Sequence, residues 1–163
     1  MITINCNLIN INQENYDEII NDLDLYRLIC PKCGHSGLKI HGYYSRKLKT
    51  KLGTIYLRVI RVICKECGST HALLLSCIVP YSSMDLKSHI RIINKDNIKG
   101  LMLEISDIDE SNVAYTLKMY KLHYKERLLS VDIKIDDNLV FNCFKHFNKQ
   151  FMQIKCTSNC LFS

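Results

Sequence analysis

Two short stretches decide the fold of this chain: Cys30-Pro31-Lys32-Cys33-Gly34 and Cys64-Lys65-Glu66-Cys67-Gly68. Each contains two cysteines separated by two residues and followed by glycine, and thirty residues separate the two pairs. Such a pair forms a tight turn whose sulfurs point at one metal ion, and the glycine permits the backbone conformation that closes the turn. The spacing therefore predicts one tetrahedral zinc site with four ligands: Cys30, Cys33, Cys64 and Cys67.

The alternatives to a metal site are disulfides or unrelated buried thiols. The opening residues Met1-Ile2-Thr3-Ile4-Asn5 show no basic segment leading into an apolar core, so we expect no signal peptide and a cytoplasmic location. In a reducing compartment, the nine cysteines favour metal ligands and free thiols over a disulfide framework. Because four thiolates leave no open coordination position, we expect the zinc to be structural and not catalytic.

The segment between the two cysteine pairs predicts a β-hairpin. Residues 38–44 are β-prone, Gly53 marks a turn, and residues 55–63 are rich in β-branched side chains and end directly at the second cysteine pair. A third strand is expected within residues 70–79. Strands and cysteine pairs together predict a zinc ribbon.

The residues on either side of the ribbon predict helices. Before it, Ile2 and Ile4 suggest a short strand, and residues 12–25 suggest an acidic helix. After it, residues 90–105 carry the apolar period of one amphipathic helix, and a second helix is expected to start at Ser106 or Asp109. Two helices joined by a short polar turn have the outline of a helix-turn-helix.

The predicted fold class is thus α+β, with a small β zinc ribbon followed by a helical, helix-turn-helix-like domain. We expect an acidic helical lead-in over residues 1–26, the ribbon over 27–82 and the helical domain over 83–163. Within the last domain, residues 130–137 alternate apolar and polar side chains, as in a short strand or wing, and a further helix is expected from Val140 to Phe151.

Three further groups of side chains contain residue types that can bind a metal ion. His71 follows the last ligand by four residues, but four thiolates already suffice, so we expect a packing or polar contact. Cys77 lies in an apolar run and is expected to be a core thiol. The C-terminal set has an unconventional spacing, so we expect buried or incidental thiols, with a second metal site as the alternative: Cys143, His146, Cys156 and Cys160.

Positive charge is concentrated in the ribbon. The chain has a net charge of +6, and the segment from Lys32 to Glu66 holds nine basic residues and one acidic residue. Tyr43, Tyr44 and Tyr56 lie among these cations, a combination that suits phosphate contacts and base stacking. The alternative is a solvated basic face in a chain rich in lysine, isoleucine and asparagine.

The candidate nucleic-acid contacts come from the ribbon and from the exposed face of the second helix of the pair. They are Lys39, Arg46, Lys47, Lys49, Lys51, Arg58, Arg61, Asn112, Tyr115, Lys118 and Lys121.

Several stretches resemble known families: residues 30–34, His41-Gly42-Tyr43-Tyr44-Ser45-Arg46, residues 61–67 and residues 70–74. They are similar to the zinc-ribbon head of bacterial insertion-sequence transposases. They more closely resemble a small uncharacterised bacterial family, known only as a domain of unknown function, in which such a ribbon precedes a helix-turn-helix-like region. The ending at residues 150–155 also resembles that family, so the resemblance covers roughly residues 25–160. It implies DNA binding connected with mobile elements.

A transposase of the usual type also needs three carboxylates that hold two metal ions on a ribonuclease-like core. The acidic residues beyond the ribbon show no such placement on strands, so we expect no nuclease or strand-transfer activity: Asp85, Glu104, Asp107, Asp109, Glu110, Asp132, Asp136 and Asp137.

The expected function is DNA binding by a non-catalytic protein of mobile-element origin. The alternative is a mobile-element or phage-encoded interaction module whose ribbon docks on a host protein complex, and RNA binding would use the same basic and aromatic side chains. No run approaches the roughly eighteen apolar residues of a membrane span, so no membrane partner is expected. The sequence leaves the oligomeric state open.

Overall fold

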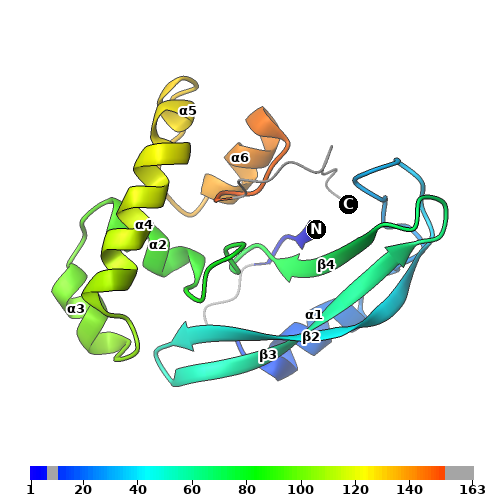
Figure 1. The fold of residues 1–163 in the computed structure, drawn as a ribbon, viewed down its shortest axis with the longest axis horizontal. Helices are drawn as coiled ribbons and strands as arrows, with labels where there is room; N and C mark the ends of the chain where they lie inside the picture. The colour runs from blue at the N-terminus through cyan, green and yellow to red at the C-terminus, as the bar shows by residue number, and fades with distance from the viewer. Residues whose placement is uncertain (7–10, 153–163) are drawn as a thin grey trace.

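The computed structural model describes residues 1–6 and 11–152, which form a four-stranded mixed sheet and six helices (Figure 1). The strands are β1 (Ile2–Ile4), β2 (Leu38–Thr50), β3 (Gly53–Cys64) and β4 (Thr70–Leu75). The helices are α1 (Gln13–Asn21), α2 (Leu86–Ile93), α3 (Ile98–Glu104), α4 (Glu110–His123), α5 (Lys125–Leu129) and α6 (Leu139–Phe147). Five of these helices follow the sheet along the chain, which confirms the predicted α+β class. None of the described helices combines the length and the apolar character that crossing a bilayer requires.

A long antiparallel hairpin of β2 and β3 forms the frame of the sheet, whose strand order is β1-β4-β3-β2. Leu38 lies opposite Cys64 at the base of the hairpin, and Thr50 lies opposite Gly53 at its tip. β2 is longer than the expected 38–44 because its alternation continues through the basic segment, where Leu48 is 1% exposed and faces the core. Lys47 and Lys49 therefore lie on a strand, and Lys51 lies in the turn that follows it.

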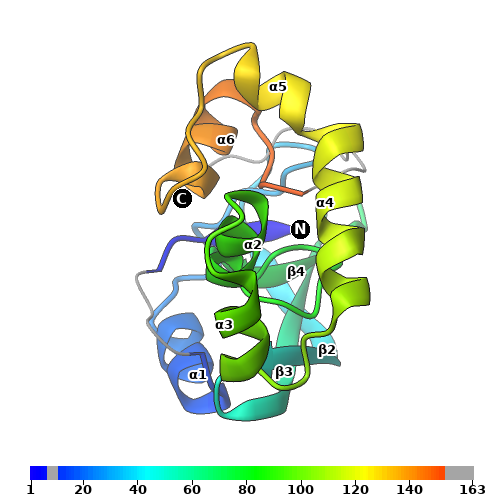
Figure 2. The ribbon, with the colours of Figure 1, turned by 90° about the vertical axis from the view of Figure 1, so that its left-hand side faces the viewer.

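The N-terminal residues share the core of the hairpin. β1 pairs in parallel with β4, with Ile4 opposite Leu75, and the apolar side of α1 packs into the same buried cluster. In Figures 1 and 2, α1 lies alongside the hairpin. The residues expected as a lead-in thus supply an edge strand and a covering helix to the sheet.

Tyr16 of α1 connects β3 and β4 where their backbones diverge. The two strands pair from Arg61 to Ile63 of β3, so Ile60 and Leu73 would form the next pair along the ladder. Instead, the buried Tyr16 hydroxyl accepts a hydrogen bond from the Ile60 amide and donates one to the Leu73 carbonyl, each at 3.0 Å. One side chain thereby satisfies two backbone groups that would otherwise be buried and unpaired.

The single helix predicted over residues 90–105 was wrong, because the chain forms α2 and α3 with a break at residues 94–97. Lys95 and Asn97 have φ angles of 58° and 40°, and the Asn97 side chain accepts a hydrogen bond from the Gly100 amide at the start of α3. Polar side chains that bond to nearby backbone compete with helical hydrogen bonding, which explains the break.

Helix α4 begins where the sequence predicts. Asp109 is its N-cap, and a capping box joins Asp109 and Asn112. α2, α3 and α4 surround a small core that includes Ile92, Leu101 and Ile108. The expected pair of helices joined by a polar turn is therefore present, with a short first helix of seven residues.

The remaining helices form a second core. Val140, Phe144 and Phe147 of α6 pack into it, as predicted, together with Phe151 beyond the end of the helix. The predicted strand or wing over residues 130–137 was wrong: this segment forms no strand, and Ile133 is buried in the helical core. Ile133 and Ile135 pack into this core from the loop between α5 and α6, and Val131 is exposed.

We predict that Tyr16→Phe destabilises the fold by about 1–3 kcal/mol, because the change leaves the Ile60 amide and the Leu73 carbonyl buried without partners. Chemical denaturation would measure the difference in free energy of unfolding. Tyr26, which is 67% exposed, provides the control, since Tyr26→Phe should leave that free energy unchanged. Equal stabilities of the two variants would contradict the bridging role of Tyr16.

Candidate metal centre and basic surface

The two cysteine pairs form turns with matching hydrogen bonds. In the first, the Gly34 amide donates to the Cys30 carbonyl at 2.9 Å; in the second, the Gly68 amide donates to the Cys64 carbonyl at the same distance. Gly34 and Gly68 have φ angles of 77° and 66°, in the left-handed region that favours glycine. The CxxCG pattern is therefore explained by the backbone of both turns.

The four sulfurs of these turns converge, as the spacing predicts. All lie within 4.8 Å of one another, with Cys30 and Cys67 Sγ 3.7 Å apart and Cys33 and Cys64 Sγ 3.5 Å apart. A tetrahedral ion with metal–sulfur bonds of about 2.3 Å requires sulfurs about 3.8 Å apart, so the set fits such an ion. Cys30 and Cys64 are fully buried, and the other two cysteines are half-buried. Four converging sulfurs can thus hold one metal ion and close its coordination shell.

Hydrogen bonding and neighbouring thiols of the cluster shift the pKa values of Cys33 and Cys67. Hydrogen bonds from the side chain and backbone of Ser69 lower the pKa of Cys67 to about 6. A backbone hydrogen bond from His35 lowers the pKa of Cys33, but burial and the neighbouring cysteines outweigh it and raise that pKa to about 12. Four thiolates this close repel one another unless a cation compensates their charge.

His71 on β4 makes the polar contact that the sequence analysis expected. Its Nε2 lies 3.3 Å from Cys30 Sγ, and its Nδ1 lies 3.2 Å from the amino group of Met1. Burial, with smaller contributions from the N-terminal amino group and Lys32, lowers the pKa of His71 to about 4, so the ring is neutral near pH 7. With Nδ1 accepting from the amino group, Nε2 carries the proton and donates to Cys30, as residues behind a metal ligand commonly do.

The structure divides the predicted nucleic-acid contacts of the ribbon into exposed and internally bonded side chains. Lys39, Lys47, Arg58 and Arg61 are exposed, and Arg61 also donates a hydrogen bond to the Thr70 hydroxyl at 2.9 Å. Lys39 lies close to Lys65, and this neighbouring ammonium group lowers the pKa of Lys65. Positive charge is therefore gathered beside the second cysteine turn.

We use the name outer hairpin face for five exposed residues on one side of β2 and β3: Tyr43, Ser45, Lys47, Tyr56 and Arg58. Ser45 lies opposite Arg58, and Lys47 lies opposite Tyr56. The Arg58 guanidinium carbon lies 4.6 Å from the centre of the Tyr43 ring, in a cation–π contact. Aromatic rings and cations thus alternate along this face.

The other predicted ribbon cations make contacts within the protein. Arg46 donates to the carbonyls of Val79 and Ser82 at 2.6 and 2.9 Å. Lys51 forms an ion pair with Glu104 of α3 at 2.8 Å. These side chains hold the hairpin to the segments that follow the sheet.

Lys49 connects the hairpin tip to the start of α4. Its ammonium group donates to the Asp107 carbonyl and to Asn112 Oδ1, each at 2.5 Å. Thr54, opposite Lys49 on β3, donates to the Asp107 carboxylate. In Figure 1 the tip of the hairpin lies beneath α3 and the start of α4, whereas the cysteine turns lie at the other end of the hairpin.

On α4, the predicted contacts differ in their exposure. Tyr115 is 60% exposed, and Lys118 and Lys121 are exposed. Asn112 bonds to Lys49 and to the Asp109 amide, so its side chain serves the hairpin contact and the helix cap. Helical periodicity in the sequence placed Asn112 on the exposed face of the helix, but it could not indicate that Asn112 bonds to Lys49 on β2.

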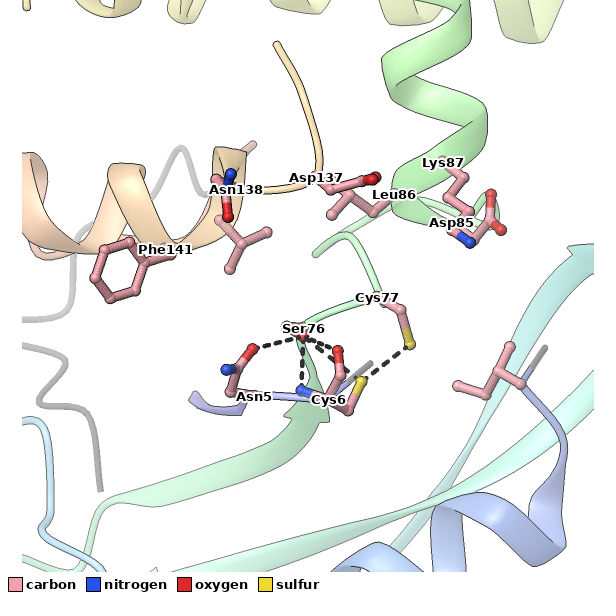
Figure 3. A pocket seen from close by; sticks show the side chains of 12 residues that line it. Asn5, Cys6, Ser76, Cys77, Asp85, Leu86, Lys87, Asp137, Asn138 and Phe141 are labelled. Carbon is pink, nitrogen blue, oxygen red and sulfur yellow. Dashed lines mark hydrogen bonds between the residues drawn. The ribbon is translucent and has the colours of Figure 1, made fainter. Parts of the chain in front are cut away.

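A cavity of about 520 Å³ lies between the sheet and the helical part (Figure 3). Cys6 and Cys77 line it, with their sulfurs 3.6 Å apart. Cys77, expected to be a core thiol, packs at the margin of the sheet core and is half-buried. Of the second predicted metal set, Cys143 is buried and His146 is exposed on α6, and Cys156 and Cys160 lie outside the described residues.

We predict that Cys64→Ser abolishes metal binding and unfolds the ribbon, because a small ribbon depends on its metal for folding. Metal content and circular dichroism measured on the same sample would report both effects. Cys143→Ser removes a buried thiol outside the cluster and should retain the metal. A metal-free but folded Cys64→Ser variant would contradict a structural role for the metal.

We predict that His71→Ala weakens metal affinity by about 10-fold or more, because Cys30 loses its hydrogen bond from the ring. Competition with a chromophoric chelator would measure the affinity. His35→Ala is the matched control, since His35 is exposed beside the first cysteine turn. Equal affinities of the two variants would show that the His71 contact does not support the site.

The chain was compared with protein families, curated proteins and solved structures. No curated protein and no solved structure matches it. One family model, described as "Domain of unknown function (DUF6431)", matches residues 30–113, which is just over half of the 163 residues. The match starts at the first cysteine of the cluster and covers the hairpin, β4, α2, α3 and the start of α4. It agrees with the resemblance to a family of unknown function, and by this match the chain belongs to the DUF6431 family.

Proposed function

We propose that this protein binds DNA without catalysing a reaction, that it shares its origin with the transposases of mobile elements, and that one structural zinc ion holds its ribbon. The observation that carries the proposal is the outer hairpin face, where exposed cations and exposed tyrosines lie on the same side of two paired strands. Lysine and arginine suit phosphate contacts, and exposed tyrosine rings suit stacking on bases.

Zinc is the metal that suits the cysteine cluster best. Four thiolates are a common ligand set for structural zinc, and the sulfur separations of 3.5 and 3.7 Å agree with tetrahedral coordination. Such a site leaves no position for water or substrate, so the ion would fix the two turns at the base of the hairpin. The residues that would hold it are Cys30, Cys33, Cys64 and Cys67.

Helix α4 offers a second basic surface. Lys118, Lys121 and Tyr115 are exposed, and α4 follows a short helix and a polar turn as the second helix of a helix-turn-helix does. Asn112 stays outside this proposed surface, since a base contact would require its bond to Lys49 to break. The proposed DNA contacts are therefore Lys39, Lys47, Tyr56, Arg58, Arg61, Tyr115, Lys118 and Lys121.

The carboxylates beyond the ribbon support a non-catalytic function. Asp85 caps α2, Asp109 caps α4, and Glu104 bonds to Lys51 and Arg91. These groups serve helix caps and ion pairs, and they are not grouped as the ligands of a two-metal centre would be.

The second candidate function is docking on another protein. Leu52 at the hairpin tip is 87% exposed and Leu103 on α3 is 86% exposed. Their sequence neighbours Lys51 and Glu104 form an ion pair, so both leucines belong to the same region of the surface. Exposed leucines in one region favour an apolar partner surface.

We predict that the zinc-loaded protein binds random duplex DNA with an affinity that falls steeply as salt is raised, since phosphate contacts release counterions. Replacing both Lys47 and Arg58 with alanine should reduce the slope of log affinity against log salt by about 2. Fluorescence anisotropy across a salt series would measure the slopes, with RNA of the same sequence as a second ligand.

Lys134→Ala provides the matched control, because Lys134 is exposed on the segment between α5 and α6. Its slope should equal that of the wild type. Absence of binding at low salt would contradict the proposal and favour the docking function, and tighter binding of RNA would reassign the ligand.

A further inference from the structure

Cys6 and Cys77 form a thiol pair outside the metal cluster. Their sulfurs lie 3.6 Å apart, although seventy residues separate them in the sequence. Figure 3 shows the two side chains pointing towards each other, Cys6 at the end of β1 and Cys77 just beyond β4. Two thiols from distant segments are thus already held in contact.

The sheet register explains why the two cysteines meet. β1 and β4 run parallel with Ile4 opposite Leu75, and the Ser76 amide extends the ladder by donating to the Ile4 carbonyl at 2.8 Å. Beyond Leu75 the chain turns, with the Ile78 amide donating to the Leu75 carbonyl at 2.9 Å, and the Cys6 amide donates to the Ser76 hydroxyl oxygen at 3.0 Å. These bonds hold Cys6 against the turn that contains Cys77.

Both thiols are accessible from the cavity of about 520 Å³ described above. Cys6 and Cys77 are half-buried and line its wall, as do Lys87 and Asn138, which offer polar groups to a ligand. Cys143, by contrast, is buried. Small thiol reagents therefore have a route to this pair.

We propose that Cys6 and Cys77 are a site of reversible thiol–disulfide exchange that takes a low-molecular-weight disulfide as its reaction partner. The Cys6 thiolate attacks one sulfur of the small disulfide, which forms a mixed disulfide and releases one small thiolate. Cys77 then attacks Cys6 Sγ, which forms the Cys6–Cys77 bond and releases the second small thiolate. The protein loses two protons and two electrons, and the small disulfide gains the electrons and becomes two thiols after protonation.

The surroundings of the pair suit this order of attack. The Ser76 hydroxyl lies 3.5 Å from Cys6 Sγ and fixes the Cys6 backbone, accepting from its amide at 3.0 Å and donating to its carbonyl at 3.2 Å. The hydrogen bond with Cys6 and burial raise the pKa of Cys77, which keeps that thiol protonated until Cys6 has reacted. Cys6 is therefore the attacking thiol and Cys77 the resolving thiol.

The bond would fasten the end of β1 to the segment that leads into α2. The Leu86 amide at the start of α2 donates to the Cys77 carbonyl at 2.9 Å, so Cys77 is already connected to that helix. A cross-link that closes a loop of seventy residues restricts the unfolded chain strongly. We expect the oxidised protein to be more heat-stable than the reduced protein, with its zinc site intact.

The test is incubation of the zinc-loaded full chain with oxidised glutathione, followed by peptide mass mapping, metal analysis and thermal melting. We expect a linked peptide containing Cys6 and Cys77 that is lighter by two hydrogen atoms, an unchanged metal content, and a melting temperature raised by about 5–10 °C. Loss of metal before the linked peptide appears, or stable glutathione adducts at both cysteines of the pair, would overturn the proposal.

Single substitutions separate the roles of the two thiols. Cys77→Ser should accumulate the mixed disulfide on Cys6 at least about 10-fold above the wild type, because the resolving thiol is missing. Cys6→Ser should accumulate none at Cys77, and Cys143→Ser should behave like the wild type. Mapping of the wild-type chain tests the bond itself even if one variant fails to fold.

Discussion

The convergence of four cysteine sulfurs at one end of the β2–β3 hairpin is the constraint on which the rest of the structure depends. The first cysteine turn precedes β2, and the second begins at the last residue of β3. Because the four sulfurs lie within 4.8 Å of one another, the start of β2 lies beside the end of β3, with Leu38 opposite Cys64. From that pair the hairpin register runs to the tip, with one shift near Gly42. β4 leaves the second turn and returns along β3, which places His71 behind Cys30. The two cysteine turns thus fix the start of β2 and the end of β3, and they determine which side chains face the cluster.

Local patterns in the sequence predicted the parts of the fold that depend on neighbouring residues. The cysteine turns, the hairpin turn at Gly53 and the cap at Asp109 all follow from short-range chemistry. The break at residues 94–97 was missed because the apolar residues of α2 and α3 keep helical spacing across it and pack into the helical cores. The Tyr16 bridge and the parallel β1–β4 pair join residues far apart in the chain, for which the sequence carries no periodic signal.

The distribution of charged residues in the sequence located the basic region, but it could not show which cations make contacts within the protein and which remain exposed. Lys49 and Lys51 lie at the hairpin tip. Lys49 donates hydrogen bonds to the Asp107 carbonyl and to Asn112, and Lys51 forms an ion pair with Glu104. Arg46 is bonded to backbone carbonyls. Lys49 and Lys51 have these partners because α3 and the turn before α4 pack on the hairpin tip, a tertiary contact that the sequence leaves undefined. The cations that remain exposed without an ion pair to α3 or a bond to α4 therefore lie on the outer hairpin face and beside the second cysteine turn.

The internally bonded lysines at the tip and the cysteine turns at the base explain how the long β2–β3 hairpin can present a defined surface. An isolated hairpin is marginally stable in water, but here both ends are attached. The cysteine turns hold the base, and the bonds from Lys49 and Lys51 hold the tip to α4 and α3. Between these attachments, Tyr43 and Arg58 already contact each other, so little ordering would accompany ligand binding. Because Lys49 is also bonded to Asn112, the hairpin and the start of α4 are kept in a fixed relation, which no short-range pattern in the sequence encodes.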